Sequence, residues 1–274
     1  MDLSAIIVIN ADGHKIWRGS MLAAERRNLI LEKVYEDKKV IVSELSREFK
    51  VSEETIRRDL EKLAGDGHVI KGYGGAVINE KTDIDLPFNV RWKYNAEGKK
   101  KIADLVKREI EDGDHIILDA STTAVFIAKS IKQKKRLTVI TNSIENMLEL
   151  SGVSGWDIIS TGGVLNSDSM SLIGKKAAEE VMSYNADKLF LSCRGLDLEK
   201  GITDGNDEIV NVKQKMIQSA AKVYLAADSS KFGKVAFSQI CSIKDVDVII
   251  TDRKPEKVWL DAFKEMSVEC VYPD

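Results

Sequence analysis

Short polar side chains follow several apolar runs in the second two-thirds of the chain. Ser121, Thr122 and Thr123 come soon after the run at 115–118, and Asn142 follows the run at 137–141. Hydroxyl groups and free backbone N–H groups at the start of a helix are suited to binding an anion, phosphate in particular. A single cluster of this kind is most often a helix cap or a turn. Because the clusters recur at the ends of successive runs, they favour an anion-binding site.

The apolar runs have the length of buried strands, and helical patterns separate them. The runs lie at 115–118, 137–141, 156–160, 188–192, 223–227 and 246–251, and the helical patterns at 97–110, 124–131, 144–150, 175–183 and 209–221. This alternation predicts an α/β domain with a mainly parallel sheet covered by helices on both faces. Ligands of such open sheets bind at the carboxyl ends of the strands, where the polar clusters would meet.

Residues 39–63 have the pattern of two short helices joined by a tight turn. Ser43 and Ser52 are placed to cap the two helices, because a serine at a helix start accepts a hydrogen bond from an unpaired backbone N–H. The second helix repeats apolar residues at i, i+4 and i+7, which predicts one buried stripe. A supporting helix is expected at 23–36 and a hairpin at 68–78. Together these elements predict a winged helix-turn-helix, an arrangement that reads DNA.

The polar residues outside the apolar stripe are the candidates for contact with DNA. They are Ser52, Thr55, Arg57 and Arg58 on the second helix, and Lys71 and Tyr73 on the hairpin. Two amphipathic helices with an arginine pair also occur in ordinary helical bundles. The chain has a net charge of −3, so DNA binding would require its cations to gather on one face, where they can release counterions from phosphates.

Residues 21–78 resemble the DNA-binding domain of the DeoR family of bacterial transcriptional regulators. The resemblance is carried by the decapeptide VSEETIRRDL at 51–60 and by the sequence GYGGA at 72–76. The hairpin departs from the family at two positions, since Lys71 and Tyr73 stand where arginine and histidine are often found. Both replacements still reach a phosphate.

Residues 95–252 look like the effector-binding domain of the same family. The matching residues are DASTT at 119–123, TNS at 141–143, Gly162 with Gly163, Ser171 with Gly174, GITD at 201–204 with Lys213, and DSSKF at 228–232. The resemblance implies a fold related to ribose-5-phosphate isomerase and a phosphorylated sugar as ligand. After Asn206 the chain departs from the family's Glu-Glu-Ala, which leaves a sugar contact by Glu208 open.

The resemblance also implies a role for each group of candidate residues. Ser121, Thr122 and Thr123 are expected to surround the phosphate, Asn142 and Asp204 to bond sugar hydroxyls, and Lys213 and Lys231 to supply positive charge. The alternative for Lys213 is a solvated residue on a helix surface. The full predicted effector-binding set is Asp119, Ser121, Thr122, Thr123, Asn142, Gly162, Gly163, Asp204, Lys213 and Lys231.

Two functions of different classes fit these residues. The first is a transcriptional regulator, expected to be a repressor of sugar-metabolism genes, which binds double-stranded operator DNA under the control of a phosphorylated sugar. The second is a sugar-phosphate isomerase or deaminase with an appended DNA-binding domain. Asp204, Glu208 and Lys213 are possible acid and base groups for the second, yet they form no compact motif. The helix-turn-helix with its wing favours the regulator, which is expected to be a dimer or tetramer because specific sites usually contain two half-sites.

Composition restricts the remaining possibilities. The chain has 274 residues, of which 43% are hydrophobic, which is enough for two folded domains. No apolar run approaches the ~18 residues of a membrane span, and Cys193, Cys241 and Cys270 lack metal or redox spacing. We therefore expect no membrane partner, no metal or other cofactor, and a cytoplasmic location. The expected divisions are a foreign or mis-started leader at 1–20, the DNA-binding domain at 21–79, a linker at 80–95 and the effector domain at 96–274.

Overall fold

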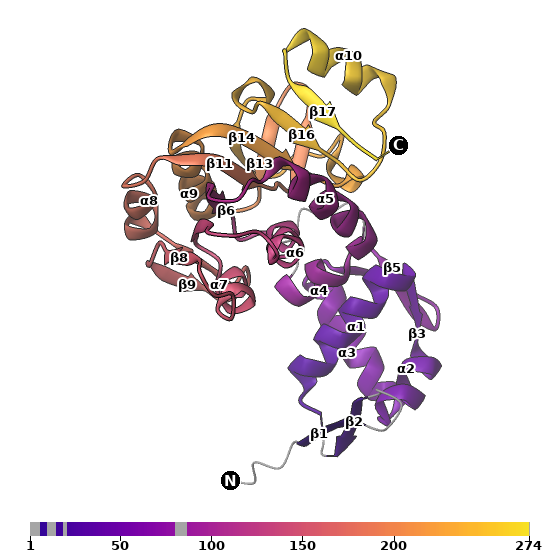
Figure 1. The fold of residues 1–274 in the computed structure, drawn as a ribbon. Coiled ribbons are helices and arrows are strands. Elements are labelled where there is room, and N and C mark those ends of the chain that lie inside the picture. Colours follow the sequence, from indigo (N-terminus) through magenta and orange to yellow (C-terminus); the bar gives the residue numbers. More distant parts are fainter. Residues whose placement is uncertain (1–5, 10–14, 19–20, 80–86, 274) are drawn as a thin grey trace. The chain divides into compact units, whose positions relative to one another are not determined.

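The computed structural model describes residues 6–9, 15–18, 21–79 and 87–273. The chain divides into two compact units, unit 1 (Met1–Ile84) and unit 2 (Asp85–Asp274), which are described separately (Figure 1). Within the expected leader, β1 (Ile6–Ile9) pairs antiparallel with β2 (Lys15–Arg18). The rest of residues 1–20 lies outside the described residues.

Unit 1 contains the predicted winged helix-turn-helix. Its elements are α1 (Ala23–Asp37), β3 (Lys39–Ile41), α2 (Val42–Phe49), α3 (Glu53–Gly65), β4 (Val69–Gly72) and β5 (Gly75–Ile78). The three strands form an antiparallel sheet in the order β3-β5-β4. The prediction that Ser43 caps the first helix was wrong, because residues 39–41 form a strand and α2 begins two residues earlier than expected, with Ile41 at its N-cap. Ser52 does cap α3.

A buried ion pair joins α3 to α1, and sequence analysis did not predict it. Asp59 is 4% exposed, its Oδ2 lies 2.5 Å from Arg26 Nε, and its Oδ1 lies 3.6 Å from Arg27 Nη1. Around this pair, Ile30 of α1 and Ile56 of α3 are fully buried. The apolar stripe therefore packs α3 against α1, and the ion pair fixes one register between them.

Unit 2 is built on a parallel sheet of seven described strands, which confirms the predicted α/β fold class. In sheet order these are β17 (Glu269–Val271), β16 (Val248–Ile250), β14 (Ala220–Ala226), β11 (Ala186–Leu191), β6 (His115–Leu118), β7 (Thr138–Thr141) and β8 (Asp157–Ser160). The strand order reverses between β6 and β11: β7 and β8 continue to one side of β6, while β14, β16 and β17 continue to the other side of β11. Such a reversal is the topological switch point, where ligands of open α/β sheets bind.

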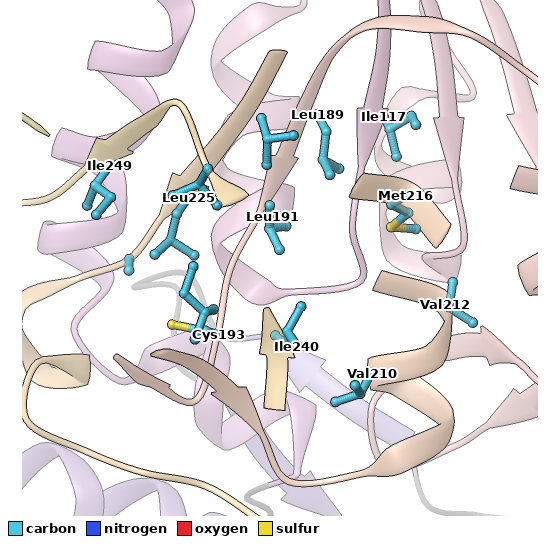
Figure 2. Close-up of a cluster of buried hydrophobic side chains, with 14 of the residues drawn as sticks. Ile117, Leu189, Leu191, Cys193, Val210, Val212, Met216, Leu225, Ile240 and Ile249 are labelled. Carbon is cyan, nitrogen blue, oxygen red and sulfur yellow. The ribbon is translucent and has the colours of Figure 1, made fainter. Parts of the chain in front are cut away.

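Helices cover both faces of the sheet. One face carries α5 (Ala96–Glu109), α6 (Thr122–Ile131) and α7 (Ile144–Leu150), and the other carries α8 (Lys175–Val181), α9 (Asp207–Gln218) and α10 (Lys257–Glu265). Alternate residues of β6 serve the two cores, since Ile117 packs into the α8–α10 side and Ile116 into the α5–α7 side. Figure 2 shows the former, with strand residues such as Leu189 and Leu225 above Val212 of α9.

Smaller strands complete unit 2. β9 (Val164–Asn166) and β10 (Ser171–Ile173) form a hairpin, and β12 (Gly195–Asp197), β13 (Gly201–Asp204) and β15 (Ser238–Cys241) form a separate antiparallel sheet. These strands were not predicted, nor were α10 and β17. Each strand is three or four residues long, which is too short for a periodic pattern to identify.

Helix α4 (Phe88–Lys93) lies within the stretch 80–95 that was expected to be a linker. Pro87 is the N-cap of this helix. Trp92 stacks on Phe126 of α6 with ring centroids 4.6 Å apart, so α4 is packed onto unit 2. The expected linker is therefore too long at its carboxyl end, while residues 80–86 lie outside the described residues.

The described helices include none with the length and apolar character that a membrane crossing requires. Cys193, Cys241 and Cys270 are free thiols. Burial raises the pKa of Cys193 and of Cys241 to about 12 and that of Cys270 to about 11, so all three are weak nucleophiles near neutral pH.

Candidate DNA-binding surface and effector site

Helix α3 presents its two arginines to solvent. Arg57 Nη2 lies 2.6 Å from Glu53 Oε2 and Arg58 Nε lies 3.3 Å from Glu54 Oε1, with the arginine side chains 50% and 76% exposed. Exposed pairs at this spacing contribute only about 0.3–0.5 kcal/mol each. DNA phosphates or base edges can therefore replace the glutamates at small cost.

The start of α3 is held by a local hydrogen-bond network. Ser52 Oγ accepts from the Thr55 backbone N–H at 3.2 Å, and the two hydroxyl oxygens lie 2.9 Å apart. The Ser52 and Thr55 side chains thus stand at the amino-terminal end of α3, on the same helix as the two arginines. Recognition helices of this class contact base edges with their amino-terminal residues.

The wing extends from α3 as the hairpin β4–β5. Lys71 Nζ lies 2.7 Å from Glu61 Oε1 of α3, and this hydrogen bond lowers the pKa of Glu61. Tyr73 is fully exposed at the tip. Gly74 has φ +83°, and a Cβ on Gly75 would lie 2.1 Å from the Val40 carbonyl oxygen, so the turn depends on glycine at both positions. All six predicted DNA-contact residues therefore lie on α3 or on the wing attached to it.

Asp119 bridges the two strands at the switch point of unit 2. It follows β6, is fully buried, and its Oδ1 accepts from the Ser121 backbone N–H at 3.0 Å. Its Oδ2 accepts from the Ser192 backbone N–H, just after β11, at 2.9 Å. One carboxylate thus holds together the carboxyl ends of both central strands.

Lys213 of α9 reaches the same point from the opposite side. Its Nζ donates to Asp204 Oδ2 at 2.7 Å and to the Ser192 carbonyl oxygen at 2.7 Å, and it lies 3.2 Å from Asp119 Oδ2. Two of the three ammonium hydrogens are therefore used in hydrogen bonds, and Asp119 lies within ion-pair distance of the same group. Lys213 is 6% exposed, which excludes the solvated-surface alternative, and its ammonium group lies between the carboxylates of Asp119 and Asp204. Its position makes it a support for the two carboxylates.

Electrostatics stabilise this buried centre in its charged form. Burial alone would lower the pKa of Lys213, but Asp204 and Asp119 outweigh it and raise that pKa. Burial would likewise raise the pKa of Asp204, whereas Lys213, followed by Arg194 at 3.6 Å, lowers it. Both members of the pair therefore remain ionised across the physiological range.

The predicted phosphate cradle forms the start of α6, directly after Asp119. Ser121 is the N-cap, and its Oγ accepts from the Ala124 backbone N–H at 3.0 Å. Thr122 and Thr123 occupy the first turn, where backbone N–H groups have no helical partner. Neither threonine hydroxyl has a hydrogen-bond partner among the described residues. The cradle thus offers hydroxyls and the positive end of a helix dipole at the switch point.

Asn142 follows β7 beside this cradle. Its Nδ2 donates to the Leu172 carbonyl oxygen at 3.0 Å, while its Oδ1 is buried without a partner in the described part of the chain. Behind it, Asn146 Nδ2 donates to the Asp119 carbonyl oxygen at 2.9 Å. The amide oxygen of Asn142 is therefore available to accept a hydrogen bond from a ligand.

The remaining predicted residues lie farther along the sheet edge. Gly163, after β8, has φ +113°, and a Cβ there would lie 2.6 Å from the Ile173 carbonyl oxygen, so close packing explains this glycine. Gly162 has open space around it. Lys231 ends the short turn η1 (Ser229–Lys231) after β14. In the described part of the chain, neither glycine nor Lys231 forms a hydrogen bond or ion pair with the cradle.

The possible acid–base trio of the enzyme hypothesis is not assembled. Asp204 and Lys213 bond each other, whereas Glu208 is exposed and lines a surface groove between α8 and α9. Within the described ranges no three His, Cys, Asp or Glu side chains are grouped to hold a metal ion. Sequence analysis missed Asp228 and Lys99, both buried. Asp228 belongs to the quoted DSSKF motif, whereas Lys99 lies in the predicted helix at 97–110 and was not singled out.

Comparison with known proteins matches the two units to two different family models. The model of the DeoR-like helix-turn-helix domain matches residues 26–82, and the model of the DeoR C terminal sensor domain matches residues 94–253. The chain belongs to the DeoR family. It is a DNA-binding transcriptional regulator, with the DNA-binding surface on unit 1 and the family's sensor domain on unit 2.

Two relatives match the chain over most of their length. The uncharacterized HTH-type transcriptional regulator YulB of Bacillus subtilis (strain 168) is 41% identical over 249 residues, 91% of this chain and 96% of its own. The HTH-type transcriptional repressor GlcR of the same organism is 36% identical, covering 92% of this chain and 96% of its own. Ribose 5-phosphate isomerase A from Methanocaldococcus jannaschii aligns with 50% of this chain and 55% of its own, at 15% identity and a TM-score of 0.38.

Proposed function

We propose that the protein represses sugar-metabolism genes and that a phosphorylated sugar, bound at the switch point of the sensor domain, controls its affinity for operator DNA. The observation that carries the ligand class is the α6 cradle, where Thr122 and Thr123 present unpaired hydroxyls at a helix start beside Asp119. Helix starts of this kind bind phosphate. Repression is supported by the relative GlcR, which is a repressor.

The neighbouring groups suit the sugar part of such a ligand. The unpaired Oδ1 of Asn142 would accept a hydrogen bond from a sugar hydroxyl. Asp204 and Lys213 would act indirectly, by holding Asp119 and the ends of β6 and β11 in place. This assigns Lys213 a positioning role in place of the phosphate contact that the resemblance implied.

Binding without turnover fits the buried ion pair better than catalysis does. A general acid or base works best when its pKa lies near the working pH. Here the pKa of Asp204 is lowered and the pKa of Lys213 is raised, so both move away from that pH. We propose that the protein is not an enzyme. An assay of isomerisation and deamination over a panel of sugar phosphates tests this, and sustained turnover of any of them would overturn it.

Replacing Thr122 and Thr123 together by valine should abolish sugar-phosphate binding. The substitution keeps the side-chain volume and removes two hydroxyls, so a loss of roughly 10-fold or more in affinity is expected if each hydrogen bond contributes about 1 kcal/mol. Thermal stabilisation by the panel of sugar phosphates measures it. Thr138→Val, at the opposite end of β7, is the matched control. Equal stabilisation of the double variant and the parent would place the phosphate elsewhere.

Effector and operator should also alter each other's binding by one common factor. A ligand shifts DNA affinity only as far as it binds the two states of the protein differently, and typical coupling is about 1–3 kcal/mol, or roughly 5–150-fold. We expect the sugar phosphate to weaken operator binding and saturating operator to weaken sugar-phosphate binding equally. Calorimetric titration with and without operator measures this. Identical affinities in the two titrations would show that ligand binding to the sensor domain is not coupled to binding at this DNA site.

The protein would bind its operator as an assembly of at least two copies. One winged module makes few base contacts, and operators of this class carry paired half-sites. We place the protein in the cytoplasm, where it reaches chromosomal DNA. The DNA-binding domain is assigned to 21–79 and the sensor domain to the residues from α4 onward, α4 being packed on α6.

A further inference from the structure

Helix α4 packs on the helix that carries the cradle. Trp92 of α4 stacks on Phe126 of α6 with ring centroids 4.6 Å apart and an interplanar angle of 26°. Phe126 is 8% exposed and follows Thr122 by one helical turn, so the two residues lie on the same side of α6. Lys129 of α6 places its Nζ 4.3 Å from the centre of the Trp92 ring. Ring stacking and a cation over a ring both stabilise such a contact beyond the burial of its area.

The amino-terminal end of α4 is bonded to the hairpin beside Asn142. The Phe88 backbone N–H donates to the carbonyl oxygen of Asp168, in the turn between β9 and β10, at 3.1 Å. The Leu172 backbone N–H of β10 donates to the Asn142 carbonyl oxygen at 2.7 Å, and Asn142 Nδ2 donates to the Leu172 carbonyl oxygen at 3.0 Å. Helix α4 is therefore connected to both parts of the candidate effector site, the cradle helix and Asn142.

Aromatic stacking joins these two connections within α4. Phe88 stacks on Trp92 with ring centroids 6.2 Å apart, so that Phe88, Trp92 and Phe126 form one continuous row of rings. At the other end of α4, Lys99 of α5 donates to the carbonyl oxygen of Tyr94 at 2.6 Å. A helix of six residues that is held at both ends moves together with the elements that hold it, because close-packed interiors transmit small displacements.

The start of α4 is also where unit 2 receives the chain from the DNA-binding unit. Phe88 follows Ile78, the last residue of the wing strand β5, by ten residues. Unit 2 has no earlier element among the described residues, so any displacement of α4 moves the point from which the chain leads back to the wing. Coupling between distant sites requires an element whose arrangement both sites bias. Helix α4 meets this condition through its packing on one side and its covalent connection on the other.

We propose that α4 is the element that couples effector binding to DNA binding, with Trp92 as its positioning residue. A ligand in the cradle engages α6 and Asn142 together, and because both are joined to α4, the ligated and empty states hold α4 in two different arrangements. This rests on the proposed control of operator binding by a sugar phosphate and adds the route by which that control acts. Trp92 contacts neither ligand nor DNA in this scheme and acts through Phe126 and Lys129.

Trp92→Leu tests the proposal, because leucine keeps an apolar side chain on α4 and removes the stack. Calorimetry on the full chain selects the tightest of glucose 6-phosphate, fructose 6-phosphate, fructose 1-phosphate and ribose 5-phosphate. The ratio of its affinities without and with saturating operator is the coupling factor, expected at about 5–150 in the parent. Trp92→Leu should lower it to less than about 2, while the ligand affinity without operator and the operator affinity without ligand change by less than about 3-fold. Trp92→Phe, which restores a ring, should retain most of the factor.

Trp156→Leu is the matched control. Trp156 packs against the same apolar core as Trp92, but it lies just before β8, at the opposite end of the strands from the cradle. This variant should keep the parent's coupling factor. Lys129→Met removes the cation over the Trp92 ring and leaves the stack in place, so it should lower the factor roughly 2- to 5-fold. It decides the matter if Trp92→Leu no longer binds the sugar phosphate.

The other outcomes separate this proposal from the proposed function. A parent-like coupling factor in Trp92→Leu, or in Lys129→Met where Trp92→Leu has lost ligand binding, overturns the role of α4 and leaves the sugar-phosphate control standing. An equal loss of coupling in Trp156→Leu also overturns it, since any loosening of the core would then have the same effect. If the parent itself binds sugar phosphate and operator without coupling, the proposed control fails, and the role of α4 with it.

Discussion

Replacing Arg57 and Arg58 together by alanine is expected to weaken operator binding at least roughly 30-fold, because each base-reading arginine contributes about 1–3 kcal/mol. Both side chains project from α3 away from its buried stripe, and they pair with the exposed side chains of Glu53 and Glu54. The fold should persist, since those ion pairs contribute little. Fluorescence anisotropy over a series of salt concentrations measures both the affinity and the slope of its logarithm against that of salt.

The salt slope separates the two ways in which these arginines can act. A phosphate contact lowers the slope by about one unit per arginine and weakens all sequences alike, whereas a base contact reduces the preference for operator over random DNA. Lys175→Ala with Lys176→Ala, exposed on α8 of unit 2, makes the same change in net charge. A double arginine variant that matched this control in affinity and slope would place the DNA contact elsewhere.

Replacing Lys213 by methionine should destabilise unit 2 by about 3–5 kcal/mol, the cost of breaking a buried ion pair from one side. The substitution leaves Asp119 and Asp204 buried next to each other with no cation between them. Chemical denaturation measures the free energy of unfolding. Lys215→Met, on the same helix, is the control, because Lys215 Nζ makes only an exposed hydrogen bond to Gln218 among the described residues; its stability should stay within about 0.5 kcal/mol of the parent.

The loss of stability caused by Lys213→Met should become smaller as the pH falls. In the parent, the lowered pKa of Asp204 gives stability above the ordinary aspartate pKa, and the raised pKa of Lys213 gives stability below the ordinary lysine pKa. The pair is therefore fully effective from about pH 5 to pH 9. Without the cation, burial raises the pKa of Asp204, so protonation at pH 5 relieves part of the cost. A destabilisation equal at pH 5 and pH 7.5 would contradict this assignment.

The local patterns of the chain determined most of the fold. The apolar stripe of α3 and the serine at its N-cap predicted the recognition helix, because capping and helical periodicity act within a few residues. The alternation of apolar runs with helical patterns predicted the parallel sheet for the same reason. The polar residues after each run predicted a binding site at one edge of the sheet, since the carboxyl ends of parallel strands meet there.

Only the tertiary structure decided how those polar residues divide their roles. Lys213 was expected at the phosphate, but the fold buries its ammonium group among Asp119, Asp204 and Ser192. Lys99 was not among the predicted site residues, yet it is buried and donates to the carbonyl oxygens of Arg91 and Tyr94. These partners are between five and 94 residues apart in the sequence, and neither spacing nor composition can show which of them meet. Burial and pairing depend on long-range packing, and that packing decides whether a lysine faces a ligand or supports the residues that do.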